Sequence, residues 1–213
     1  LDASGSHLII GTPSGNGGKG HVAIYDQADP STPVWTLEVS SLSSDAGAGT
    51  AVAVDGEWAV IGIPGDNKAI ILKYESDGPT PQWTEHEWLS PPPGVSEFGF
   101  SIDLNNNQML IGAPGGDEAV GGFVLEDYTF PDGSTQLLWN NYGFIGTPLP
   151  PGSRWGHSVT IESSTGFVGS PQDNNGGGRV HSVHLTDGFI DIGIDLTHEI
   201  PWTNGQIGWD VMC

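Results

Sequence analysis

Ile111-Gly112-Ala113-Pro114 is the clearest copy of a tetrapeptide that occurs four times in this chain. The other three copies are Ile10-Gly11-Thr12-Pro13, Ile61-Gly62-Ile63-Pro64 and Val168-Gly169-Ser170-Pro171. Their prolines follow one another at intervals of 51, 50 and 57 residues. A second glycine stands 15 residues before three of these prolines, at Gly49, Gly99 and Gly156. A recurrence near 50 residues is typical of stacked supersecondary units.

The second copy shows that each unit consists of four short strands. Residues 50–54 alternate with Val52 and Val54 on one face of a strand, and Asp55-Gly56 forms a turn before an apolar strand at residues 58–61. Pro64 ends that strand because proline cannot donate to a sheet, and further strands follow at 69–74 and 82–88. The third and fourth copies repeat this plan. The sequence therefore predicts an all-β fold, a β-propeller built of four-stranded antiparallel blades.

The repeats divide residues 1–213 into one array, with units at about 1–47, 48–97, 98–154 and 155–206 and the start of another at 207–213. Alignment of Pro13 with Pro64 places Leu1 opposite Val52, and Val211 matches the same position. We therefore expect about four blades of a larger propeller. The alternative is a four-bladed ring that the terminal strand closes.

The composition excludes several partners. The chain has 26 acidic and five basic residues and a net charge of −21, which repels phosphate backbones and anionic membrane surfaces. No apolar run approaches the ~18 residues of a membrane-spanning helix. The only cysteine is Cys213, so no internal disulfide can form. We expect no nucleic-acid binding and no membrane insertion.

These markers resemble the FG-GAP repeats of the integrin α-subunit propeller and of bacterial and algal secreted proteins. Phe98-Gly99 matches the FG element, and Gly112-Ala113-Pro114 matches the GAP element word for word. Degenerate FG elements occur at Ala48-Gly49, Trp155-Gly156 and Ile207-Gly208. The resemblance covers the whole chain. It implies a propeller at the cell surface or outside the cell that serves adhesion and protein binding.

The resembled family often holds calcium in the hairpin between the first two strands of a blade. Only one such hairpin here has alternating oxygen side chains, at Asp103, Asn105 and Asn107, and Gln108 replaces the expected glycine. Calcium takes about six to eight oxygen ligands, several of them carboxylates. The sequence favours an Asn-rich turn at this position, and a calcium site is the alternative.

Acidic residues recur just after the prolines of the repeat, at Asp66, Asp117 and Asp173. Equal positions in a propeller place them on one rim. They can cap the turns through hydrogen bonds to the backbone, or form a ring of carboxylates that binds a cation or a basic partner. Aromatic residues expected near the same rim, Trp155 and Trp202 together with Trp209, are candidate stacking platforms for a glycan.

The sequence therefore predicts a non-enzymatic extracellular module that binds a protein partner or assembles with copies of itself through its rim loops. The alternative is a carbohydrate-binding, lectin-like propeller. An enzyme of polysaccharide metabolism would need paired carboxylates ~5–10 Å apart, and the sequence shows no such pair. Residues 15–20 match G-x-G-x-x-G, but a strand follows them instead of the helix that a dinucleotide site needs.

Overall fold

The computed structural model describes residues 1–77, 80–147, 149–173, 177–186 and 189–195. Four antiparallel sheets of four strands make up this part of the chain, each in the order of the sequence. Sheet 1 contains β1 (Asp2–Ser4), β2 (His7–Gly11), β3 (Val22–Asp26) and β4 (Asp29–Thr36). Sheet 2 contains β5 (Val52–Asp55), β6 (Trp58–Ile63), β7 (Lys68–Glu75) and β8 (Gln82–Leu89).

Sheet 3 contains β10 (Ser101–Asn105), β11 (Gln108–Ala113), β13 (Ala119–Thr129) and β14 (Thr135–Gly146). Sheet 4 contains β15 (Ser158–Glu162), β16 (Thr165–Ser170), β17 (Arg179–Thr186) and β18 (Phe189–Asp195). The loops hold a short strand pair, β9 (Val95–Ser96) with β12 (Gly115–Gly116), and 3-10 turns η1 (Asn16–Gly18) and η2 (Pro64–Asp66). The G-x-G-x-x-G stretch lies in the loop before β3, as predicted.

The structure confirms the all-β prediction and the four-stranded antiparallel units. Observed strands fall where the repeats predict them, and β6 ends at Ile63, directly before Pro64. Among the described strands, β13 and β14 are the longest, with 11 and 12 residues. The described residues include no helix long and apolar enough to cross a membrane.

Consecutive sheets pack against one another through three apolar cores. One core joins sheets 1 and 2, a second joins sheets 2 and 3, and a third joins sheets 3 and 4. Sheets 2 and 3 are covered on both faces, and β6 is accordingly buried along its whole length. The first strands of successive sheets also lie next to one another, since β5 contacts β1 and β10, and β10 contacts β15.

The two repeated glycines meet at each of these sheet junctions. A Cβ added to Gly62 would lie 2.8 Å from the carbonyl carbon of Gly99 and closer still to its oxygen. Gly112 would meet Gly156 in the same way, with the carbonyl carbon at 2.9 Å. Gly99 and Gly156 have φ of +90° and +86°, a conformation that suits glycine. Both positions therefore recur as glycine because the backbone of one sheet lies directly against that of the next.

Candidate functional site

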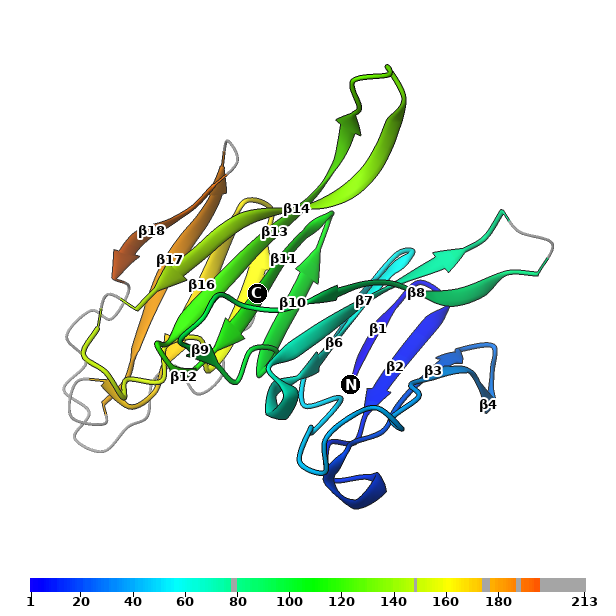
Figure 1. Ribbon diagram of the computed structural model, residues 1–213, viewed down its shortest axis with the longest axis horizontal. Coiled ribbons are helices and arrows are strands. Elements are labelled where there is room, and N and C mark those ends of the chain that lie inside the picture. The colour runs from blue at the N-terminus through cyan, green and yellow to red at the C-terminus, as the bar shows by residue number, and fades with distance from the viewer. Residues whose placement is uncertain (78–79, 148, 174–176, 187–188, 196–213) are drawn as a thin grey trace.

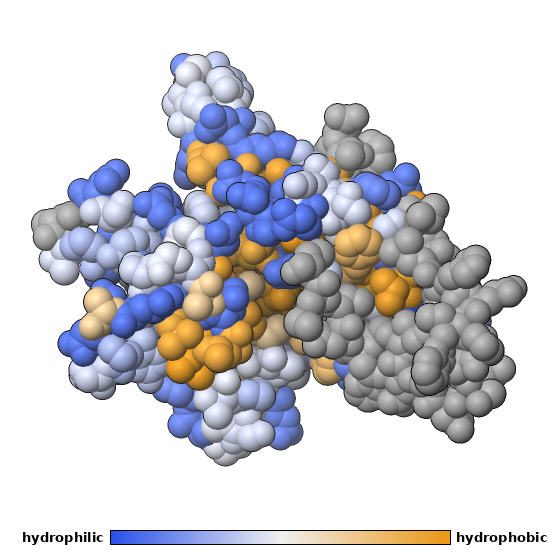
Figure 2. Space-filling view, turned by 180° about the vertical axis from the view of Figure 1, so that it is seen from behind, coloured by the Kyte–Doolittle hydropathy of each residue, from blue (hydrophilic) through white to orange (hydrophobic). Residues whose placement is uncertain are grey.

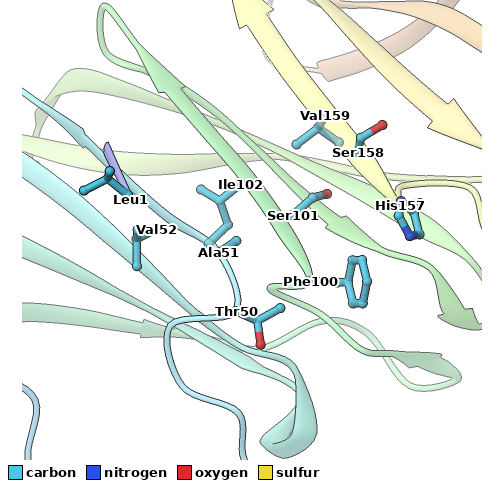
Figure 3. Close-up of a pocket in the computed structure, with 10 residues that line it drawn as sticks. All are labelled: Leu1, Thr50, Ala51, Val52, Phe100, Ser101, Ile102, His157, Ser158 and Val159. Atoms are coloured by element: carbon cyan, nitrogen blue, oxygen red, sulfur yellow. The ribbon is translucent and has the colours of Figure 1, made fainter. Parts of the chain in front are cut away.

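A pocket of ≈ 260 Å³ lies where the first strands of the sheets begin (Figure 3). Three consecutive positions of three repeats line it, each set directly after a repeated glycine. The lining residues are Thr50, Ala51 and Val52 of the second repeat, Phe100, Ser101 and Ile102 of the third, and His157, Ser158 and Val159 of the fourth. Leu1 of the first repeat also lines the pocket. They gather because β5, β10 and β15 lie side by side in equivalent positions.

The repeat positions in the pocket differ in how much they vary. The second position is always small, at Ala51, Ser101 and Ser158, and the third position is always a β-branched apolar residue in these repeats. The first position varies from a hydroxyl at Thr50 to aromatic rings at Phe100 and His157. The scaffold is therefore constant, while the side chains at the pocket mouth change from sheet to sheet.

The aromatic side of the pocket is built around Phe100. Its ring centroid lies 5.0 Å from that of His157, and the guanidinium carbon of Arg154 lies 5.2 Å from the Phe100 ring. Arg154 also forms an ion pair with Glu97 at 3.2 Å. A ring with a cation on its face and an imidazole beside it can receive an apolar or neutral polar group by stacking.

The hydroxyl groups of the pocket also stabilise the loops around it. Ser101 Oγ donates to the carbonyl oxygen of Gly156 at 2.8 Å, across the junction between sheets 3 and 4. Thr50 Oγ1 donates to the carbonyl oxygen of Gly47 at 2.7 Å. These bonds connect the pocket wall to the neighbouring loops.

The predicted rim carboxylates take different roles. Asp66 is half-buried, and its Oδ2 accepts from the backbone N–H of Ser43 at 3.2 Å. Asp173 is buried and its Oδ2 lies 2.7 Å from Nε of Arg179, whereas Asp117 is exposed. Within the described residues, no three His, Cys, Asp or Glu side chains gather so as to hold a metal ion.

Trp155 requires a correction. Its side chain is 0% exposed and packs in the core between sheets 3 and 4, with its ring 5.1 Å from that of His181. It takes the place that Phe98 holds one repeat earlier, because the FG aromatic fills the space at the sheet junction. Trp155 therefore offers no platform to a glycan or another partner. Trp202 and Trp209 lie outside the described residues.

The hairpin predicted to be an Asn-rich turn, with calcium binding as the alternative, connects sheet 3 to sheet 4. Asp103 Oδ2 accepts from the N–H of Ile161 at 2.7 Å and from Thr160 Oγ1 at 2.8 Å. Asn105 donates to Glu162 at 3.3 Å, and Asn107 has φ of +66° in the turn. The Asn-rich turn is thus formed with its aspartate directed at the neighbouring sheet.

The same cross-sheet bond joins sheets 1 and 2. Asp2 Oδ2 accepts from the N–H of Val54 at 2.8 Å. Asp2 and Asp103 each stand 11 residues before the proline of their repeat, so they are equivalent residues. An aspartate on a first strand therefore secures the next sheet in two of the three junctions.

Sequence reasoning missed two oxygen side chains that hold the loops. Glu118 is buried and accepts from the N–H groups of Gly152 at 2.7 Å and Trp155 at 3.0 Å. Asn67 Oδ1 accepts from the N–H of Phe98 at 2.9 Å. Both residues directly follow the predicted rim aspartates Asp66 and Asp117, so the signal lay one residue further along the chain.

Comparisons with known proteins identify no family. No family model matches the chain, and no curated protein sequence matches it. Among solved structures, the crystal structure of Sqt1 from Chaetomium thermophilum matches 89% of this chain, with 13% sequence identity and a TM-score of 0.43. This chain spans 57% of the length of that one. We draw nothing about function from a similarity of this level.

Proposed function

We propose that the four sheets are blades of a β-propeller of the FG-GAP type. The contacts of each first strand with the next support this arrangement, because the innermost strands of a propeller line its axis. The glycine pairs support it as well, since one backbone contact recurs at successive junctions. A pocket lined by equivalent positions of several repeats is what the mouth of a central axis would form.

On this scaffold we propose a non-enzymatic interaction module that acts outside the cell or at its surface. The module binds a protein partner, or a copy of itself, through the loops around the pocket. The observation that carries this proposal is the variation among Thr50, Phe100 and His157, which follow an unvarying glycine and line one pocket. Varied side chains on a rigid, repeated frame are the usual basis of recognition by loops.

The test places a charge at the pocket mouth. Thr50 and its hydrogen bond to Gly47 are both exposed, so Thr50→Arg should lose little stability and should obstruct an incoming partner. Thr32→Arg, at an exposed position of β4, is the matched control for the added charge. Sedimentation equilibrium measures self-association, and cross-linking of the secreted proteins of the producing cells identifies partners. The proposal fails if both variants retain the same assemblies and cross-links as the wild type.

Carbohydrate binding is the second candidate, and an exposed tryptophan favours it. Trp88 on β8 is 41% exposed, and its indole N–H donates to Glu85 at 3.3 Å. The Nζ of Lys68 lies 5.8 Å from the ring centroid. An aromatic face beside a carboxylate is a chemically suitable platform for a sugar ring. Binding to a glycan array would support this function if Trp88→Ala abolishes the signals and Val34→Ala, the control at another exposed apolar residue, retains them. An array without any signal for the wild type would exclude it.

A further inference from the structure

The hairpin of β13 and β14 extends far beyond the body of sheet 3 (Figure 1). β13 pairs with β11 up to Val124, whereas its pairing with β14 continues as far as Thr129↔Thr135. Residues 126–138 therefore form a two-stranded extension, here called the arm. The arm stands clear of the rest of the molecule in the opposite view as well (Figure 2). Among the described strands, only β14 pairs with β13 beyond Leu125, so the opposite edge of β13 is free there.

The arm is ordered by its own contacts. The N–H of Phe130 donates to the carbonyl oxygen of Ser134 at 2.8 Å, and Asp132 Oδ1 accepts from the N–H of Ser134 at 2.9 Å. The rings of Tyr128 and Phe130 meet edge to face at 4.9 Å. A two-stranded hairpin without further packing is only marginally stable in water. An extended hairpin that exposes a strand edge is a feature that a binding role would explain.

The two faces of the arm differ in chemistry. Tyr128 is 45% exposed and lies on one face, opposite Gln136. Asp127 is exposed and lies on the other face, because neighbouring residues of a strand point to opposite sides. A strand added along β13 would thus place alternate side chains against an aromatic ring and against a carboxylate.

The charge of the arm selects the occupant. It contains Glu126, Asp127 and Asp132 and no Lys, Arg or His. Glu126 accepts from the Tyr142 hydroxyl and from Asn140 at 3.1 Å, and Asp132 accepts from Ser134, which leaves Asp127 for a partner. A second copy of this chain would bring another arm of the same charge, and the whole chain carries −21. Charge complementarity therefore favours a basic partner.

We propose that the arm is a docking site for an extended segment of a partner protein in which basic and apolar residues alternate. The segment adds as a strand along the free edge of β13 at residues 126–129. Its basic side chains face Asp127, and its apolar side chains pack on Tyr128. This site lies at the end of sheet 3 opposite the pocket, so it is independent of the interaction function proposed above.

The test uses a short peptide of alternating Lys and Val, capped at both ends, and the full chain labelled for amide NMR. Shifts confined to residues 126–138 are expected at physiological ionic strength. Asp127→Lys should weaken binding by about tenfold or more, whereas Glu87→Lys, an equal charge change at an exposed site on β8, should alter it by less than about twofold. A peptide N-methylated on alternate residues should not bind, because it cannot complete a strand ladder.

Three results would overturn the proposal. Equal losses in Asp127→Lys and Glu87→Lys would show that only overall charge matters. Unimpaired binding of the N-methylated peptide would exclude strand addition. Shifts in the same arm amides from self-association of the free chain would identify a second copy as the occupant. If the amide shifts of the pocket residues stay unchanged in all of these titrations, the peptide binds the arm and not the pocket. The pocket is tested separately with Thr50→Arg.

Discussion

Replacement of Gly112 by alanine tests whether close backbone contact between neighbouring sheets holds the array together. The added Cβ would lie 2.9 Å from the carbonyl carbon of Gly156 and closer to its oxygen. Both atoms belong to the backbone, so no side chain can rotate away to make room. The strands of sheets 3 and 4 must separate instead, and the apolar side chains in the core between these two sheets lose contacts.

The expected cost follows from the size of that displacement. Overpacking of a tight interior costs about 1–3 kcal/mol. Because two backbones are involved here, we expect the free energy of unfolding to fall by ~3 kcal/mol, near the upper end of that range. For a chain of this size the melting temperature should then decrease by roughly 6–12 °C. Gly62→Ala should behave alike, since Gly62 meets Gly99 in the same way.

Scanning calorimetry of Gly112→Ala and Gly146→Ala provides the comparison. Gly146 is exposed at the end of β14, and an added Cβ there meets no atom within 4 Å. Its replacement should change the free energy of unfolding by less than ~0.5 kcal/mol. If the two variants melt together, the glycine contact does not hold the sheets, and the explanation of the repeat given above is refuted.

Three further predictions follow from individual side chains. Asp103→Ala should lower the free energy of unfolding, measured by urea titration, by ~2 kcal/mol, because two donors of sheet 4 lose their acceptor. If added calcium raises the melting temperature of the wild type, Asp103 belongs to a metal site instead. Glu118→Ala should lower the free energy of unfolding by ~3 kcal/mol, because buried N–H groups lose their acceptor. Glu118→Gln should lower it less, and equal stability of the two variants would contradict this explanation. Burial lowers the pKa of His7 below 6.5, against the opposing charge of Asp26. The unfolded chain therefore takes up a proton that the folded chain lacks, so stability should fall as pH decreases from 6.5 towards the folded pKa. His7→Phe should flatten that slope in urea titrations, and an unchanged slope would show that His7 is not its source.

The local features of the fold were readable in advance. Pro114 directly follows the last residue of β11 because proline has no N–H to donate, and Asp55-Gly56 turns the chain within two residues. Val52 and Val54 lie on the same face of β5, against the core between sheets 1 and 2, and their spacing of two residues is a local signal of a strand. Such signals lie within a few residues, so the four-stranded units could be predicted almost strand by strand.

The site was predicted less well, because its residues depend on contacts between sheets. Trp155 was predicted to be a stacking platform for a glycan, but its side chain is buried between sheets 3 and 4, as that of Phe98 is between sheets 2 and 3. Asp103 was assigned to an Asn-rich turn with calcium binding as the alternative, and its bond to the N–H of Ile161, a residue far along the chain, could not be predicted. Glu118 was overlooked because nothing local distinguishes it from Asp117.

The sequence alone determined that this protein consists of repeated antiparallel units, since strand ends, turns and alternation are set by neighbouring residues. Only the tertiary structure decided that the two glycines of the repeat touch across a junction and that Phe100 and His157 share a pocket. It also revealed the arm, whose free edge exists because β11 stops while β13 continues. These features depend on how separate segments meet in space, and that information is not carried by any one segment.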